Sequence, residues 1–283
     1  MNRRTGGAGM RVYISADMEG ATGVVNVDQT DCERPEYAFG CRMQLHDVNA
    51  VVDGLLDAGV DDILVNDSHD RMINLDAGGL NPRARLLSGW PKVMGMLEGY
   101  EGADAAFFVA YHAMAGTECA VLDHTVSGRR VYSVVLNGVE VGEIGLNAAA
   151  CAGCGVPVAL VTGDRAACGE AVGLLGDGVT TACVKTAHGR CAADCLTPGA
   201  SAPLLREAAA RAVERVRKNE APRMDIGDGS FDLRITFHTT AQCDQAAVLP
   251  CAERLGGRTL RVCGSGMAEM RRWANVLIGL GGA

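Results

Sequence analysis

Aromatic side chains are scarce in this sequence, at 4% of 283 residues, and no long hydrophobic run is present. A transmembrane helix needs about 20 consecutive apolar residues, so we expect no membrane-spanning helix and no membrane partner. The first nine residues contain two arginines and lack the apolar core of a signal peptide. These absences predict a soluble, cytoplasmic protein.

Basic residues are in the minority, because 26 Lys plus Arg stand against 34 Asp plus Glu and the formal net charge is −8. No stretch concentrates enough positive charge to follow a phosphate backbone, so a nucleic-acid partner is not expected. The glycine fingerprint of dinucleotide-binding proteins is also missing after the first predicted strand, where Asp17 and Glu19 stand instead. The sequence therefore argues against both nucleic-acid and dinucleotide partners.

Cysteine is abundant, with 12 residues, but its spacing lacks the pattern of a structural zinc site. Cys151 and Cys154 form the only C-x-x-C pair, and no second pair completes a four-cysteine site. A disulfide framework is not expected in a cytoplasmic chain. We predict that the cysteines are mostly small buried thiols.

Short apolar runs alternate with segments of helical periodicity along the first two thirds of the chain. Such alternation is typical of an α/β fold, here a mostly parallel central sheet flanked by helices. A helix is predicted at 41–58 and ends at Gly59. Strands are predicted at 11–16, 63–65, 86–87, 105–111, 131–136 and 156–161.

The last third of the chain has a different organisation. A helix predicted at 203–216 precedes a polar, glycine-containing stretch at 218–230, and two strands and a closing helix follow at 232–238, 258–262 and 268–280. We predict an N-terminal extension at 1–10, a main α/β domain at 11–200 and a smaller C-terminal α+β domain at 201–283.

Two acidic residues follow the first predicted strand. Asp17 and Glu19 stand two residues apart, so an extended backbone directs both carboxylates to the same side. Such a pair repels unless a cation lies between its members. A divalent metal is one solution, and Lys, Arg or a helix terminus are others.

Histidines occupy the ends of two further predicted strands. His69 ends Asn66-Asp67-Ser68-His69, and His112 follows a very apolar run. The carboxyl ends of parallel strands line the ligand crevice, and zinc sites that combine histidine with carboxylates keep open positions for water or substrate. Taken singly, each histidine could be a hydrogen-bonded structural residue, but their shared location indicates catalytic zinc.

Two other polar residues have ambiguous surroundings. Glu143 lies in a stretch of small and apolar residues, where a buried carboxylate needs a partner. It is either a metal ligand or an acid at a helix N-terminus. His124 is equally ambiguous, whereas His46, His188 and His238 are expected to be structural or exposed.

Five motifs follow one another along the chain: Ser15-Ala16-Asp17-Met18-Glu19-Gly20, Asn66-Asp67-Ser68-His69, Tyr111-His112-Ala113, Asp123-His124-Thr125 and Val141-Gly142-Glu143-Ile144-Gly145-Leu146-Asn147. In this order they closely resemble the D-aminopeptidase family of zinc metallopeptidases. The resemblance covers about 11–197 and extends more loosely to the C-terminus. It implies two zinc ions per subunit, with Asp17 bridging them, and a catalytic role for His124. The implied metal ligands are Asp17, Glu19, His69, His112 and Glu143.

The resemblance further implies an aminopeptidase that hydrolyses short peptides with an N-terminal D-residue, such as D-Ala-D-Ala. A water activated by two metals would attack the amide, with His124 acting as general acid and base or as nucleophile. Family members assemble as stacked rings, so a homo-oligomer, a decamer, is expected. Two alternatives stay open: a zinc amidohydrolase or peptidase of other specificity on the same scaffold, and a non-catalytic protein that binds small peptides.

Overall fold

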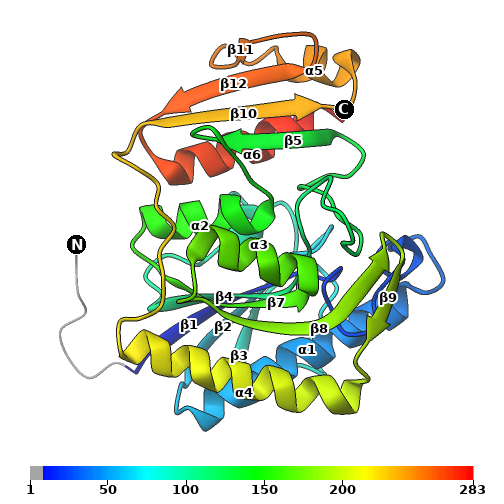
Figure 1. Cartoon of the computed structure of the whole chain (residues 1–283), viewed down its shortest axis with the longest axis vertical. Helices are drawn as coiled ribbons and strands as arrows, with labels where there is room; N and C mark the ends of the chain where they lie inside the picture. Colours follow the sequence, from blue (N-terminus) through cyan, green and yellow to red (C-terminus); the bar gives the residue numbers. More distant parts are fainter. Residues whose placement is uncertain (1–8, 283) are drawn as a thin grey trace.

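A seven-stranded, mostly parallel sheet forms the centre of the computed structural model, which describes residues 9–282 (Figure 1). Its strand order is β3-β2-β1-β4-β7-β8-β9, and only the β8–β9 pair is antiparallel. This confirms the predicted fold class. The strands are β1 (Arg11–Ala16), β2 (Asp62–Asp67), β3 (Ala84–Leu87), β4 (Ala105–Tyr111), β7 (Val158–Asp164), β8 (Thr180–Gly189) and β9 (Ala192–Cys195).

Helices cover both faces of this sheet, which explains why its inner strands are continuously apolar. Helices α1 (Tyr37–Asp57) and α4 (Pro198–Arg217) pack together on one face, and α2 (Glu143–Gly153) and α3 (Arg165–Leu175) lie on the other (Figure 1). Alternate residues of β1 therefore enter different cores. Val12 and Ile14 join the cluster with α1 and α4, whereas Tyr13 joins the cluster with α2.

A second, antiparallel sheet has the order β11-β12-β10-β5-β6. Its strands are β5 (Val131–Leu136), β6 (Val139–Glu140), β10 (Phe231–Phe237), β11 (Glu253–Arg254) and β12 (Thr259–Gly264). Helix α5 (Thr240–Ala246) follows β10, and α6 (Met267–Leu280) lies between this sheet and α2 (Figure 1). Two short 3-10 helices, η1 (Val27–Gln29) and η2 (Gly95–Leu97), lie in loops beside the central sheet. The smaller sheet therefore combines a middle segment of the chain with the C-terminal third.

Helix α4 spans residue 200 and packs against α1, β7 and β8. The division of the chain at about residue 200 stays a prediction, and residues 1–8 of the predicted extension lie outside the described residues. None of the helices within 9–282 is long and apolar enough to cross a membrane.

All twelve cysteines are described and are free thiols. The prediction that they are mostly buried is wrong, because five are exposed and four are partly buried. Only Cys151, Cys168 and Cys243 are buried. Many of the exposed cysteines lie in turns and at strand ends, where a small side chain is tolerated without being packed.

Strand pairing brings three loops together at the carboxyl edge of the central sheet. Ala16 pairs with Asp67 on β2 and with Val109 on β4. The residues that follow these positions therefore leave the sheet side by side. The register alone thus places the Asp17, His69 and His112 segments at one site.

Candidate metal centre

Asp17 lies between two histidines and directs one carboxylate oxygen to each. Its Oδ1 is 3.3 Å from His69 Nδ1, and its Oδ2 is 3.4 Å from His112 Nε2. His69 Nδ1 is also 3.1 Å from Glu19 Oε2, and His112 Nε2 is 3.2 Å from Glu143 Oε1. The cluster therefore has two halves that share Asp17.

His124 adjoins the half that contains His112 and Glu143. Its Nε2 lies 3.7 Å from Glu143 Oε1, and its ring stacks on His112 with centroids 3.9 Å apart. His124 Nδ1 lies 2.8 Å from the carbonyl oxygen of Leu122, which can only accept. The hydrogen bond assigns the proton of the neutral ring to Nδ1 and leaves the lone pair on Nε2. Its side chain is 18% exposed, so a ligand can reach it.

The structure brings together all six residues that the sequence singled out. Within the described residues, candidate ligand atoms converge in two overlapping groups, in each of which they lie within 4.8 Å of one another. One group is Asp17, Glu19 and His112, and the other is His112, His124 and Glu143. His69 joins through the contacts given above. His46, by contrast, lies on α1 beside Ser201, and His238 packs against Tyr132 on the second sheet.

Several polar atoms of the cluster are buried and unsatisfied. In the part of the chain that the structure describes, Asp17 Oδ2, Glu19 Oε2 and His112 Nε2 have only the close ionic contacts given above and make no hydrogen bond of good geometry. Each such atom costs about 1–3 kcal/mol when nothing replaces its water. Carboxylate oxygens and imidazole nitrogens are ligands of zinc. The donor set and its unsatisfied atoms therefore fit a metal ion of this type.

Protons partly neutralise the cluster when no cation is bound. Burial, reinforced by Glu19, raises the pKa of Asp17 to about 7. Burial disfavours the charged forms of His69 and His112, but the nearby carboxylates outweigh it and raise both pKa values. For Glu143, burial is likewise outweighed, chiefly by His112, and its pKa falls to about 2. A bound metal would displace these protons, because zinc ligands must be deprotonated.

Residues outside the cluster hold the loops that carry it, and the sequence analysis missed them. The buried amino group of Lys185 on β8 donates to the carbonyl oxygens of Glu19 and Ala21, at 2.5 and 2.7 Å, and to that of Val24. Asp164 accepts from Val121 N at 2.7 Å and so fixes the loop before His124. The sequence signal that could have identified Lys185 is a lysine inside an apolar strand, since a buried amino group must find acceptors.

Gly20 allows a close approach between two of these loops. A Cβ atom at this position would lie 2.0 Å from the carbonyl oxygen of Tyr111. Any side chain would push the Asp17–Glu19 segment away from the His112 segment. The glycine after the acidic pair is therefore required by packing.

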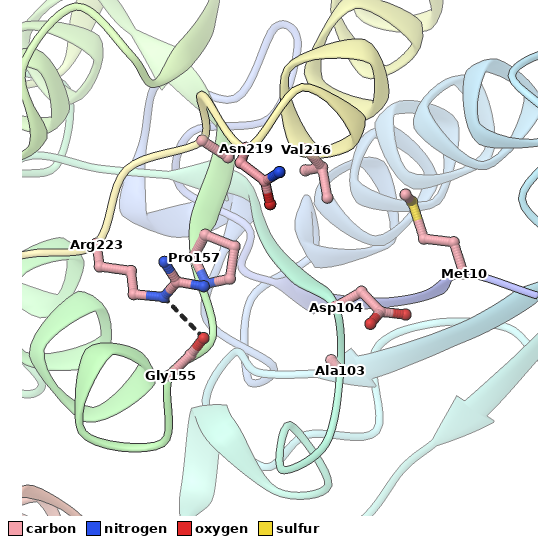
Figure 2. A pocket seen from close by; sticks show the side chains of 9 residues that line it. Met10, Ala103, Asp104, Gly155, Pro157, Val216, Asn219 and Arg223 are labelled. Atoms are coloured by element: carbon pink, nitrogen blue, oxygen red, sulfur yellow. Dashed lines mark hydrogen bonds between the residues drawn. The ribbon is translucent and has the colours of Figure 1, made fainter. Parts of the chain in front are cut away.

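The six-residue cluster is distinct from a surface pocket of about 440 Å³, shown in Figure 2. That pocket lies at the amino ends of β1, β4 and β7, and Met10, Asp104, Pro157 and Arg223 are among the residues that line it. Arg223 donates to the carbonyl oxygen of Gly155 there. The pocket and the six-residue cluster thus lie at opposite edges of the central sheet.

Three comparisons with known proteins agree. A sequence model described as D-aminopeptidase matches residues 10–276. A D-aminopeptidase of Bacillus subtilis (strain 168) is 34% identical over 251 residues, which are 88% of this chain and 89% of that protein. The solved structure of the Zn-dependent D-aminopeptidase DppA from Bacillus subtilis, described as a self-compartmentalizing protease, has a TM-score of 0.91. It is 32% identical, and the alignment covers 96% of this chain and 98% of the other.

Proposed function

Because this chain belongs to the D-aminopeptidase family, we propose that its strand-end cluster is a two-zinc centre that hydrolyses short peptides with an N-terminal D-residue, such as D-Ala-D-Ala. The observation that carries the proposal is the convergence of buried, unsatisfied ligand atoms from Asp17, Glu19 and His112. Without a cation, these carboxylates and imidazoles have no complete set of partners.

The ligands divide into two sets that share one residue. His69 contacts one oxygen of Asp17 and also Glu19, and His112 contacts the other oxygen and also Glu143. This division supports one zinc ion in each half with Asp17 as the bridging ligand. When bound, zinc polarises a carbonyl group and lowers the pKa of water towards neutrality.

His124 has the properties of a group that moves protons. Burial, together with His112, lowers its pKa, so the ring is neutral near pH 7. The contact with Leu122 leaves the Nε2 lone pair free on the side of Glu143. His124 would accept a proton from the attacking water and return it to the departing amine, since an amide nitrogen leaves poorly unless protonated. Glu19 or Glu143 would lie close to the free amine of the peptide.

Hydrolysis of D-Ala-D-Ala beside L-Ala-L-Ala tests this function directly. We expect zinc-loaded protein to cleave the D-peptide, chelated protein to lose activity, and His124→Ala to lower kcat by about 100-fold or more while keeping its zinc. Asp123→Ala is the matched control, because its side chain lies next to His124 in the chain and pairs with the exposed Arg190. Cleavage of neither peptide by zinc-loaded protein, or full activity of His124→Ala, would contradict the proposal.

The assembly of the protein is also a proposal. The solved relative is a self-compartmentalizing protease, and we infer that this chain likewise forms a homo-oligomer of stacked rings, a decamer. Two loops expose apolar side chains that fit an interface between copies: Ile73, Trp90 and Val93 are 56%, 70% and 68% exposed. The loops are tied together where Met72 O accepts from Gly89 N and Ser88 Oγ. A cytoplasmic location stays a prediction.

A further inference from the structure

The proposed mechanism leaves unused a guanidinium buried next to the metal centre. Arg271 on α6 is 1% exposed, and its partners are amide oxygens. Nε donates to Asn147 Oδ1 at 2.8 Å, and Nη1 donates to Asn275 Oδ1. Burying a charge without a carboxylate partner costs roughly several kcal/mol. The amide oxygens of Asn147 and Asn275 offset part of this cost.

The hydrogen bonds of Arg271 continue through three further side chains. Asn147 Nδ2 donates to Tyr111 OH at 2.9 Å, and Tyr111 OH lies 2.7 Å from Ser15 Oγ. Arginine has only donors, so Asn147 must turn its oxygen to the guanidinium and its NH₂ to Tyr111. Tyr111 OH keeps its own proton to donate, and Ser15 Oγ can accept it because the Ser15 proton goes to the carbonyl oxygen of Met96 at 2.8 Å. The charge therefore fixes the orientation of Asn147, and the carbonyl of Met96 favours the same direction at the far end of the chain of hydrogen bonds.

Each side chain that Arg271 orients is next to a segment that carries a metal ligand. Ser15 lies two residues before Asp17 on β1, Tyr111 directly precedes His112, and Asn147 lies one helical turn after Glu143. Ser15 Oγ also lies 2.8 Å from Ser68 Oγ, and Ser68 directly precedes His69. This chain of hydrogen bonds thus joins α6 to the segments that carry Asp17, His69, His112 and Glu143.

We propose that Arg271, Asn147, Tyr111 and Ser15 form a positioning relay that holds the metal ligands in their relative places. This inference rests on the proposed metal centre. None of the four residues is assigned a contact with substrate. Arg271 is the positioning residue at the charged end of the relay. Through Arg271, helix α6 beneath the second sheet influences zinc affinity.

Tyr111→Phe and Arg271→Met test the relay through zinc affinity, measured by competition with a chromophoric chelator. Tyr111→Phe removes one hydroxyl and keeps the ring. We expect each variant to bind zinc about tenfold more weakly, at the lower end of the effect of outer-shell partners. Excess zinc should restore activity. Tyr100→Phe is the matched control, because this buried tyrosine contacts Cys154 Sγ and the carbonyl oxygen of Ala150 outside the relay.

A second measurement separates positioning from packing. Arg271→Met removes the desolvation cost of the buried charge but leaves Asn147 Oδ1 and Asn275 Oδ1 without their donor, so the Tm of the metal-free variant should change little although zinc binding weakens. Zinc affinities within twofold of the parent in both variants, whatever their Tm, would overturn the relay. If Arg271→Met does not fold, Tyr111→Phe decides alone. Parent protein that binds no zinc would instead refute the proposed function.

Discussion

The carboxylate of Asp17 contacts both halves of the cluster, whereas Glu19 contacts one half and Glu143 the other. A bridging ligand and a terminal ligand differ in what their removal does. Loss of a terminal carboxylate leaves one complete ion site. Loss of the shared carboxylate leaves two incomplete sites and removes the negative charge that holds two cations close together.

Asp17→Ala should therefore lose both metals, while Glu19→Ala and Glu143→Ala each keep about one of two zinc ions. Zinc per chain after dialysis, measured by atomic spectroscopy, decides this. Asp123→Ala serves as the control because its carboxylate pairs with Arg190 instead. If Asp17→Ala retained two zinc ions, Asp17 would not be the bridging ligand.

At the scale of elements, the sequence predicts strands from their apolar runs and predicts the site from polar residues at strand ends. Both kinds of inference apply to β1, β2 and β4, because parallel strands are buried on both faces and end at one edge of the sheet. The placement of β5 was not predictable in the same way. Its burial alternates, with Tyr132 exposed and Val134 buried, and its partner β10 lies about 100 residues away.

Contacts between distant elements also escaped the sequence analysis. Lys185 is a charged residue in a buried strand, and its three acceptors lie in a loop more than 160 residues earlier. Nothing in the sequence singles out Arg271, because its helix has an ordinary amphipathic pattern. Both residues support ligand-bearing segments without contacting a ligand side chain through a hydrogen bond. Sequence motifs identify metal ligands more readily than the residues that hold them.

Asp47 connects two elements, and its pKa gives a prediction about stability. It lies on α1 and accepts hydrogen bonds from Thr22 N and Oγ1 at 2.9 and 2.7 Å. Burial raises its pKa to about 6, although the bonds from Thr22 oppose the shift. A folded pKa above the unfolded value of about 3.9 means that ionisation costs stability. This contribution is favourable below about pH 4 and is lost as the pH rises through about 6.

Asp47→Asn removes the ionisation and keeps an acceptor for Thr22 N. Its free energy of unfolding, relative to the parent, should therefore rise by roughly 1 kcal/mol between about pH 5 and pH 7. Urea unfolding of zinc-loaded proteins at the two pH values measures this difference. Asp57→Asn on the same helix should show no such gain, because the exposed Asp57 pairs with Arg206, which lowers its pKa. A pH-independent difference for Asp47→Asn would contradict the argument.

At the scale of the whole molecule, the parallel sheet and the second sheet contribute differently to the proposed site. Loops at the carboxyl ends of the parallel strands supply four of the five proposed metal ligands, Asp17, Glu19, His69 and His112. The fifth, Glu143, is the first residue of α2, against which α6 packs beneath the second sheet. The proposed metal centre is partly open, because the side chain of His124 is 18% exposed. The solved relative is a self-compartmentalizing protease, and under the proposed assembly neighbouring copies of this chain would restrict access to short peptides.

Val93→Asp tests the proposed interface of Ile73, Trp90 and Val93. A carboxylate buried against an apolar partner surface is strongly unfavourable, so the variant should elute as smaller species in size-exclusion chromatography with light scattering. Val248→Asp is a close control, since Val248 is 70% exposed against 68% for Val93 and lies beyond α5. Under the proposed assembly of stacked rings, cleavage of longer D-residue peptides should increase when the rings dissociate, because the space enclosed by the copies would no longer exclude them. An oligomer of unchanged size in Val93→Asp would place the interface elsewhere.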